Sequence, residues 1–323
     1  MNISTVSAPG KLMLLGEHAV VYGRPCIVTA IDQRIHVEIE RTENTTLVIE
    51  APDVDIAGYE KSIETLGSGN IPKGAMFVEY AVQKFYAKYP CVGGVRVSVS
   101  SAFSSQIGFG SSSASTVCVI RALAEIYGKK LLAKQIFAIA HQAVLEIQGS
   151  GSGFDVAAAL YGGTLYFVAG GKTVEPLKVS NIPLVVGYTG VKADTSGLLG
   201  EVAKKMKEQP EKVTRIYDAI AKLVNDAKTK MIEGDWERVG KLMDFNQDYL
   251  RDLGVSSQKL ESLIVAAKQA GAWGAKLSGA GGGDCMIALA ADDKRKAIES
   301  AIESAGGQVI HISSSSQGVR VDA

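Results

Sequence analysis

Paired cysteines, long apolar runs and an excess of one charge are all absent from this sequence. The four cysteines, Cys26, Cys91, Cys118 and Cys285, lie far apart and form no Cys-x-x-Cys pair, which favours reduced, mostly packed thiols. Lys+Arg and Asp+Glu both number 34, so no basic surplus recruits nucleic acid or an anionic membrane. No apolar run reaches the length of a bilayer span. These absences point to a cytoplasmic enzyme or binding protein.

Two common nucleotide-binding signatures are also missing. The segment from Gly108 to Ser113 reads Gly-Phe-Gly-Ser-Ser-Ser, and it lacks the Gly-Lys-Ser/Thr that completes a Walker A loop. Ser113 stands where the third glycine of a dinucleotide fingerprint belongs. The sequence therefore disfavours a Rossmann dehydrogenase, and it contains no internal repeat or low-complexity tract.

Hydrophobic periodicity divides the chain into two parts. At 323 residues, with 46% hydrophobic and 21% charged residues, the chain has the length and composition of two globular domains. The first part predicts strands at 3–7, 25–40, 46–51, 95–99 and 164–168 and helices at 112–127 and 131–147. The second predicts helices at 195–207, 210–232, 235–252 and 257–270 and strands at 183–187, 286–289 and 308–313. We predict an α/β protein with domains at 1–180 and 181–323.

Glycine is abundant, with 35 residues, and three glycine-rich segments carry the chemistry. They are Ala8–Gly23, Gly108–Ala114 and Ser278–Cys285. Glycine lets backbone N–H groups approach an anion closely, and serine hydroxyls add donors and a potential metal ligand. In the middle segment a strand, a Gly-Phe-Gly-Ser-Ser-Ser loop and a helix would place free N–H groups at a helix N-terminus, which is a phosphate site. Standing alone, however, that segment is better explained as a glycine turn with a serine N-cap.

Together and in this order, the three segments resemble the small-molecule kinases of the GHMP superfamily, named for galactokinase, homoserine kinase, mevalonate kinase and phosphomevalonate kinase. The detailed likeness is to mevalonate kinases of the archaeal type. It is carried by Pro9-Gly10-Lys11, Gly16-Glu17-His18, Ser152-Gly153-Phe154-Asp155, Gly187–Lys192 with Thr195, Asn246-Gln247, Leu253–Ser256 and Gly279–Gly283. This resemblance implies the two-domain GHMP kinase fold, an N-terminal ribosomal-protein-S5-domain-2-like domain and a ferredoxin-like C-terminal domain with the active site between them.

The resemblance also implies the chemistry, phosphorylation of the 5-hydroxyl of mevalonate by ATP in isoprenoid biosynthesis. It assigns the ATP phosphates to Gly108, Gly110, Ser111, Ser112 and Ser113, with Mg²⁺ on Ser112. It assigns catalysis to Asp155 and Lys11 and the substrate side to Glu17, His18, Thr195 and Gly281. In this scheme His18 donates to the acid substrate and Glu17 structures the site. Without the resemblance, Asp155 could equally be a helix N-cap and Lys11 a solvated lysine.

Two features depart from the mevalonate kinase pattern. The family often has a glutamate ahead of the catalytic aspartate as a second Mg²⁺ ligand, and an ungapped match puts Val144 there. Glu146 lies two residues on, about 200° around a helix, so it serves only if the helix ends or shifts first. The segments around Asp155 and Asp284 look more like phosphomevalonate kinases, although no extra basic residues cluster near the loops to hold a second phosphate.

Several alternatives follow from these departures. Phosphomevalonate kinase is the nearest, and a non-catalytic ligand sensor of the same fold comes second. Galactokinase is disfavoured because Ala19-Val20 replace its acidic residue and tyrosine, and mevalonate-diphosphate decarboxylase because that group lacks the lysine matched by Lys11. The apolar faces of the long C-terminal helices would also allow a homodimer, though ordinary packing explains them equally well.

Overall fold

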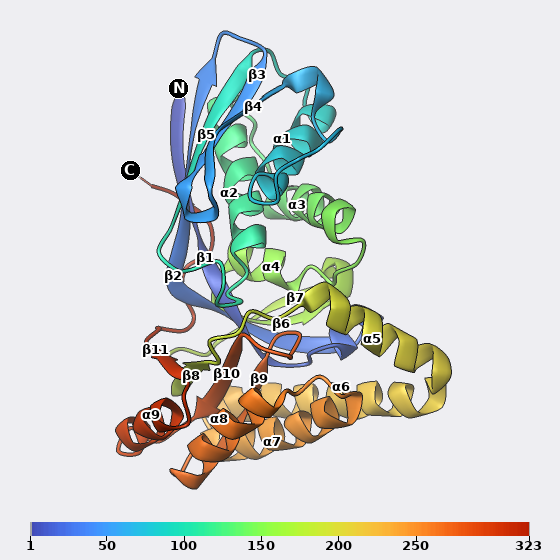
Figure 1. The fold of residues 1–323 in the computed structure, drawn as a ribbon, viewed down its shortest axis with the longest axis vertical. Helices are drawn as coiled ribbons and strands as arrows, with labels where there is room; N and C mark the ends of the chain where they lie inside the picture. Colours follow the sequence, from blue (N-terminus) through green and yellow to red (C-terminus); the bar gives the residue numbers. More distant parts are fainter. Residues whose placement is uncertain (1, 323) are drawn as a thin grey trace.

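The computed structural model describes residues 2–322, and in this range eight strands form a mixed sheet and four form an antiparallel sheet (Figure 1). The first sheet has the order β12-β1-β2-β5-β3-β4, and β6 pairs with β2 and β7. Its strands are β1 (Ile3–Leu15), β2 (Pro25–Thr42), β3 (Thr46–Ala51), β4 (Ile56–Ser62), β5 (Gly94–Ser101), β6 (Thr164–Val168), β7 (Thr173–Leu177) and β12 (Arg320–Val321). The second sheet, ordered β11-β8-β10-β9, contains β8 (Leu184–Tyr188), β9 (Gly274–Ser278), β10 (Cys285–Leu289) and β11 (Gln308–Ile310).

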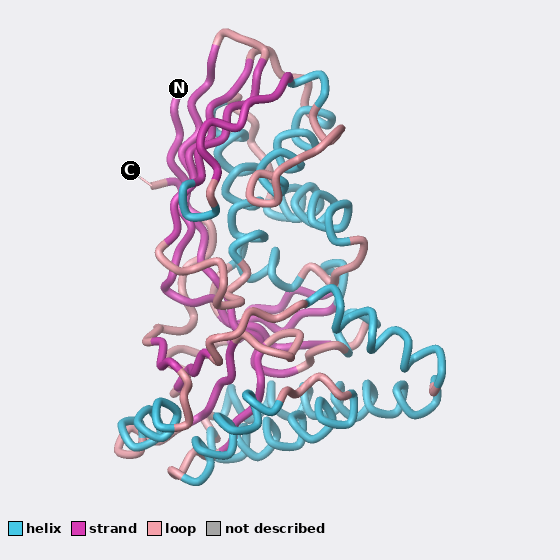
Figure 2. Tube along the Cα trace, viewed as in Figure 1, coloured by secondary structure: helices cyan, strands magenta, loops and turns pink. Residues whose placement is uncertain are grey.

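The helices divide between the two sheets, as the secondary-structure view shows (Figure 2). The helices beside the first sheet are α1 (Met76–Lys88), α2 (Ser111–Ile126), α3 (Ala133–Gln148) and α4 (Phe154–Tyr161). Those of the second half are α5 (Thr195–Glu208), α6 (Pro210–Glu233), α7 (Trp236–Leu253), α8 (Gln258–Gln269) and α9 (Arg295–Ser304). Helix α2 packs on β1 and β2, whereas α7, α8 and α9 pack on the second sheet. The predicted two-domain α/β architecture is confirmed.

The predicted elements are present, with small shifts at their ends. The helix predicted at 112–127 is α2, which spans Ser111–Ile126. The prediction is accurate because Gly110 marks the start of the helix and the spacing of apolar residues marks its extent. Strand β1 is the main difference, since it continues to Leu15 beyond the predicted end at residue 7. Its second half is buried on both faces, so it lacks the apolar–polar alternation that marks a half-exposed strand.

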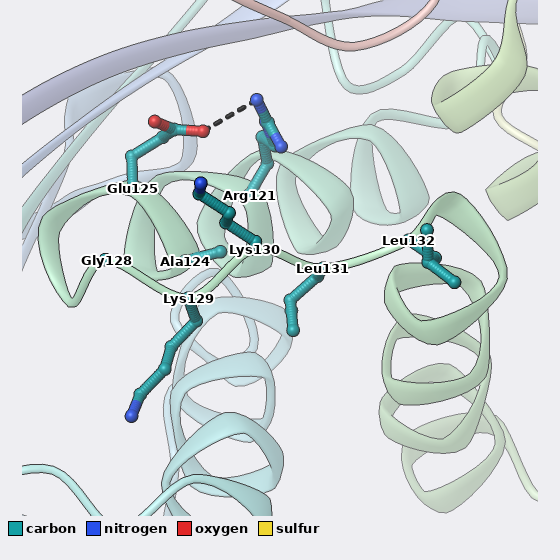
Figure 3. A pocket seen from close by; sticks show the side chains of 8 residues that line it. All are labelled: Arg121, Ala124, Glu125, Gly128, Lys129, Lys130, Leu131 and Leu132. Carbon is teal, nitrogen blue, oxygen red and sulfur yellow. Dashed lines mark ion pairs between the residues drawn. The ribbon is translucent and has the colours of Figure 1, made fainter.

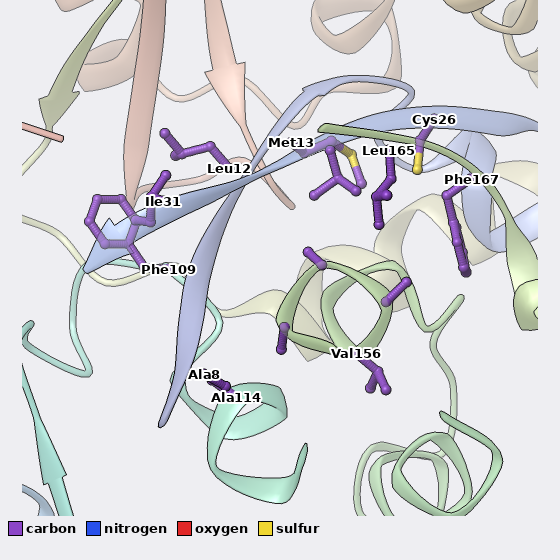
Figure 4. Close-up of a cluster of buried hydrophobic side chains, with 14 of the residues drawn as sticks. Ala8, Leu12, Met13, Cys26, Ile31, Phe109, Ala114, Val156, Leu165 and Phe167 are labelled. Atoms are coloured by element: carbon purple, nitrogen blue, oxygen red, sulfur yellow. The ribbon is translucent and has the colours of Figure 1, made fainter. Parts of the chain in front are cut away.

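The second half of β1 lies where the two sheets meet. Ser278 of β9 binds both backbone groups of Met13, accepting from its N–H at 3.1 Å and donating to its carbonyl at 2.9 Å. Buried side chains of β1, β2, β6 and α4, including Met13, Leu165 and Val156, form the core beside this joint (Figure 4). The site-bearing segments of the two halves are therefore held against one well-packed strand.

The predicted boundary near residue 180 falls between Leu177, where β7 ends, and Leu184, where β8 begins in the other sheet. The division into 1–180 and 181–323 remains a prediction. The end of the chain returns to the first sheet, since β12 pairs with β1 through Val6 and Val321. Within residues 2–322, no helix combines the length and apolar character that crossing a membrane requires.

Candidate active site

The middle glycine segment forms a loop that leads directly into α2. Gly108 and Gly110 have φ angles of 81° and 78°, which favour glycine, and Phe109 between them is buried in the core. Gly110 is the N-cap of α2, and no described side chain caps this helix end. The first N–H groups of α2 are therefore free for an anion at the positive end of the helix. A serine N-cap, the alternative for this segment, is wrong.

Lys11 of β1 is fixed beneath this loop. Its side chain is buried, its backbone N–H donates to the Phe109 carbonyl at 2.9 Å, and its Nζ donates to the Gly108 carbonyl at 2.9 Å. The ammonium also lies 5.5 Å from the centre of the Phe154 ring. A Cβ on Gly110 would come within 2.9 Å of Lys11 Cε, so glycine is required there. Lys11 is therefore a held, buried cation and not a solvated lysine.

Asp155 lies in the first turn of α4, close enough to Lys11 for the two charges to interact. The N-cap of α4 is Gly153, with a φ of 86°, so the N-cap role for Asp155 is wrong. Oδ1 of Asp155 is shielded from solvent and has no hydrogen-bond partner within residues 2–322. Burial raises the pKa of Asp155, and the positive charge of Lys11 opposes that rise. An unpartnered carboxylate oxygen beside a lysine is an arrangement that can accept a proton or bind a cation.

Glu17 forms an ion pair with Lys276 of β9, and both side chains are almost fully buried. Burial raises the pKa of Glu17 and lowers that of Lys276, while each charge opposes the shift in its partner. Oε2 of Glu17 has no hydrogen-bond partner among the described residues. Sequence reasoning missed Lys276, although a lone charge in the apolar run Gly274–Ser278 is a usable signal.

His18 adopts a φ of 59°, a backbone conformation uncommon for a residue other than glycine. Its Nε2–H donates to the Ala280 carbonyl at 2.9 Å, which fixes the proton on that nitrogen. Burial lowers the pKa of His18 and favours the neutral ring, whose Nδ1 is buried without a partner in the described chain. The predicted donation from His18 to an acid substrate would need Nε2 to leave Ala280 or Nδ1 to gain a proton.

The third glycine loop connects β9 and β10 and packs on three neighbouring segments. Gly281, with a φ of 89°, lies against the Val255 carbonyl, and Gly282 donates its N–H to that carbonyl at 2.8 Å. Asp284 accepts from the Ala193 N–H at 2.9 Å, and its other oxygen lies against Gly108 of the loop before α2. The sequence analysis used Asp284 only as a sign of the substrate class. In the structure this residue connects the third glycine loop to the loop before α2.

Two predicted residues remain, Thr195 on α5 and Glu146 on α3. Thr195 is the exposed first residue of α5, the helix whose Leu198 contacts the third loop at Gly282. Glu146 is an ion-pair partner of Lys84 on α1. The sequence allows Glu146 as a metal ligand only if its helix ends or shifts before it, and α3 instead continues to Gln148.

A separate pocket of about 370 Å³ lies at the other end of α2 (Figure 3). It is lined by Arg121, which pairs with Glu125, and by Lys129, Lys130 and Leu132 among others. Basic side chains at a helix C-terminus complement the helix dipole, which accounts for their presence here. Helix α2 has 16 residues and is about 24 Å long, and this pocket at its C-terminal end contains none of the predicted site residues.

Because the sequence predicts that the loop before α2 holds the ATP phosphates, we predict that displacement of this loop by Gly110→Ala weakens ATP binding by about 5- to 150-fold, the equivalent of about 1–3 kcal/mol. The added Cβ would meet Lys11 at a backbone conformation with a φ of 78°. Gly128→Ala is the matched control, because Gly128 also has a positive φ (61°) but has open space around it. Titration with a fluorescent ATP analogue gives both affinities, and equal losses in the two variants would contradict a special role for Gly110.

Comparison with known proteins agrees with this geometry. The description "GHMP kinases N terminal domain" matches residues 76–163, and "GHMP kinases C terminal" matches residues 227–308. The mevalonate kinase of Thermococcus sibiricus is 36% identical over 98% of this chain and 97% of its own length. The chain belongs to the GHMP kinases. It is accordingly an ATP-dependent kinase, and its curated relatives of archaeal origin include mevalonate kinases.

Solved structures give the same result for the fold. The Methanococcus jannaschii mevalonate kinase aligns with a TM-score of 0.80 and 25% identity, covering 99% of this chain and 98% of that one. A Streptococcus pneumoniae phosphomevalonate kinase aligns with a TM-score of 0.78 at 17% identity, covering 96% and 99%, which is a likeness of fold alone. The alternative substrate class is thus the more distant match.

Proposed function

We propose that this chain transfers the γ-phosphoryl group of ATP to the 5-hydroxyl of (R)-mevalonate and releases ADP and 5-phosphomevalonate. The observation that carries the proposal is the unpartnered Oδ1 of Asp155, buried beside the charge of Lys11. Asp155 lies in the first turn of α4, and Lys11 is hydrogen-bonded to the loop that precedes the uncapped end of α2. Phosphoryl transfer needs little more from a protein than positioning and electrostatic stabilisation, and these groups provide both.

The loop before α2 is proposed to hold the ATP phosphates. The free N–H groups of Ser111, Ser112 and Ser113 and the helix dipole favour the negative charge. Mg²⁺ binds proteins through one or two oxygen ligands plus substrate phosphates and water, so it needs no complete protein cage. The hydroxyl of the partly exposed Ser112 is an oxygen ligand that fits such a shell. The ion would neutralise charge on the phosphates.

Asp155 and Lys11 are proposed as the catalytic residues. The carboxylate of Asp155 accepts the proton of the attacking hydroxyl, either before or during transfer. Lys11 favours the ionised carboxylate and stabilises negative charge that develops on the hydroxyl oxygen. Its hydrogen bond to Gly108 keeps it in place without an external partner.

The substrate is proposed to bind beside Glu17 and His18, with Thr195 and Gly281 as further contacts. The neutral His18 ring offers Nδ1 as an acceptor for a substrate hydroxyl, while Ala280 holds the other nitrogen. Lys276 is fully engaged with Glu17 and is not free for a second phosphate.

Coupled ADP release with Mg-ATP, run in parallel against mevalonate and 5-phosphomevalonate, tests the substrate. We expect kcat/KM for mevalonate to exceed that for the phosphate by at least about 100-fold, since an unpaired buried phosphate would cost several kcal/mol. Preference for 5-phosphomevalonate would contradict the substrate assignment. ATP binding without turnover of either compound would support the sensor alternative.

A cytoplasmic location and a homodimer are proposed only on general grounds. All four cysteines lie within the described residues and are free, which suits a reducing compartment. The long helices α6 and α7 offer exposed apolar residues, Ile232 and Phe245, for a second copy of the chain. Sedimentation at several protein concentrations distinguishes a monomer from a dimer.

A further inference from the structure

The last residues of the chain run from the second sheet back to the first and pass the C-terminal end of α4. We name residues 313–321 the C-terminal strap. Its start is fixed to Asp32, whose Oδ1 accepts from the Ser313 N–H at 3.0 Å and whose N–H donates to the Ser313 carbonyl at 3.0 Å. Its end is β12, paired with β1. The strap is thus anchored on both sides of its passage across α4.

Between these anchors the strap binds the end of α4 through backbone groups. Val319 donates its N–H to the carbonyl of Leu160, in the last turn of α4, at 3.3 Å, and Gly163 donates to the Ser316 carbonyl at 2.7 Å. Gly318 lies so close that a Cβ there would come within 2.6 Å of the Tyr161 carbonyl carbon. A helix end usually leaves its last carbonyls to water or a cap. In α4 the strap takes the role of the cap, because Val319 donates to the carbonyl of Leu160.

Arg34 of β2 holds the strap in this position. Its guanidinium donates to the carbonyls of Gln317 and Gly318 at 2.8 and 2.9 Å. It also donates to the side chain and the carbonyl of Ser7 at 3.0 and 2.8 Å. The rigid fork of arginine matches four acceptors at once, which a lysine cannot do. A buried arginine with these acceptors is a specific clamp between β1, β2 and the strap.

A second group of contacts fixes the strap beside the turn after α4. Ser315, with a φ of 58°, accepts or donates a 2.8 Å hydrogen bond with the Thr164 hydroxyl and donates its N–H to the Thr29 hydroxyl at 3.1 Å. Thr29 and Thr164 are themselves 3.0 Å apart and fully buried. The uncommon backbone conformation of Ser315 is therefore held by two partly buried hydrogen bonds to this pair of threonines.

Helix α4 connects this clamp to the candidate active site. It has eight residues and is about 12 Å long, with Asp155 in its first turn and the strap against its last. Its sides are packed with small buried apolar residues, including Ala157, Ala158 and Ala159. The strap therefore forms a stop at the C-terminal end of the helix that carries Asp155.

We propose that the C-terminal strap and Arg34 are positioning elements that fix α4 along its axis and thereby hold the Asp155 carboxylate beside Lys11. The proposal rests on the catalytic role proposed for Asp155. A strap that only stabilised the fold would change the unfolding free energy without a selective effect on the chemical step. A misplacement of about 1 Å in a catalytic group can cost about 100-fold in rate, whereas ATP would still bind at α2.

The test uses Gly318→Ala, which pushes the strap away from α4, and Arg34→Lys as the milder variant should the first fail to fold. Gly318 does not have a positive φ, so its substitution tests the contact itself. Gly200→Ala is the control, because Gly200 also lacks a positive φ and faces open space. Hydrogen exchange of the α4 amides, kcat and KM for ATP are measured for each full-length variant.

We expect faster exchange in α4 and a 10- to 100-fold fall in kcat in the strap variants, with KM for ATP within about twofold of the parent. Unchanged exchange in α4 would overturn the proposal. So would an unchanged kcat, or a loss of kcat matched by a rise in KM for ATP.

Combination with Asp155→Asn separates this proposal from the function on which it rests. If the strap acts through Asp155, adding Gly318→Ala to Asp155→Asn lowers the residual rate by less than about twofold. A further loss equal to that of Gly318→Ala alone would overturn the positioning role. Normal activity of Asp155→Asn itself would instead reject the proposed catalysis, and the exchange of α4 would still decide whether the strap holds that helix.

Discussion

Asp155→Asn is expected to lower kcat by about 100- to 10,000-fold while leaving KM for ATP within about twofold. Asparagine keeps the shape of the side chain but removes the proton acceptor and the charge that faces Lys11. Because the phosphates are proposed to bind at α2 and not at α4, nucleotide affinity should persist. Steady-state kinetics with Mg-ATP and saturating mevalonate measure both quantities.

The pH dependence of the parent enzyme provides a second check on Asp155. Burial raises the pKa of this carboxyl above its ordinary value of 3.8. As the pH falls through that raised pKa, the carboxylate gains a proton and can no longer accept one, so the acid limb of kcat should lie above pH 3.8. Asp155→Asn should lack this limb.

Asp235→Asn is the matched control for the alternative explanation, in which Asp155 only stabilises the N-terminal end of α4. Asp235 caps α7 by accepting from the Arg238 N–H at 3.1 Å, far along the chain from the glycine loops. Asparagine also caps helices, so this change removes only the negative charge at the helix N-terminus and should cost about 0.3–1 kcal/mol of stability while leaving kcat unchanged. If Asp155→Asn behaved in the same way, Asp155 would be only a stabilising acid in the first turn of α4.

Lys276→Met is expected to lower the free energy of unfolding by about 3–5 kcal/mol. The change leaves the Glu17 carboxylate buried without its partner, and an unpaired charge in the interior loses its hydration with no compensation. Urea denaturation monitored by circular dichroism measures the loss. The double variant Glu17→Gln/Lys276→Met should recover most of it, since no buried charge remains.

The loss in Lys276→Met should also depend on pH in a defined direction. Burial raises the pKa of Glu17 above 4.5 in the folded protein, so as the pH falls its carboxyl gains a proton in the folded state before it does in the unfolded state, and the cost of the buried charge is removed. The variant should therefore approach the parent in stability on acidification towards pH 4.5.

Lys268→Met provides the comparison with an exposed pair. Lys268 pairs with Asp244 at 2.7 Å, and the two side chains are 44% and 26% exposed. Solvent screens this pair, so its loss should cost no more than about 1 kcal/mol. Equal losses from Lys268→Met and Lys276→Met would contradict the importance of burial for the Glu17 pair.

The local sequence predicted the helices, strands and glycine loops well because neighbouring residues determine them. Gly108 and Gly110 supply the backbone conformations that start α2, and apolar spacing of 3.6 residues continues it to Ile126. The expectation that Glu146 and Val144 lie on different sides of their helix also depends only on local geometry. A helix that continues through residue 148 must direct Val144 and Glu146 to different sides, and it does: Val144 is buried and Glu146 pairs with Lys84.

The sequence by itself determined the family, the three glycine segments and the candidate pair of Asp155 and Lys11, since each depends on neighbouring residues or on a motif. Only the tertiary structure decided that Lys276 is the partner of Glu17, across 259 positions in the chain. It likewise decided which His18 nitrogen is engaged, by bringing Ala280 against it, and that the strap closes the end of α4. Such contacts follow from how whole elements pack, and no local pattern specifies which distant residue fills the space beside a given group.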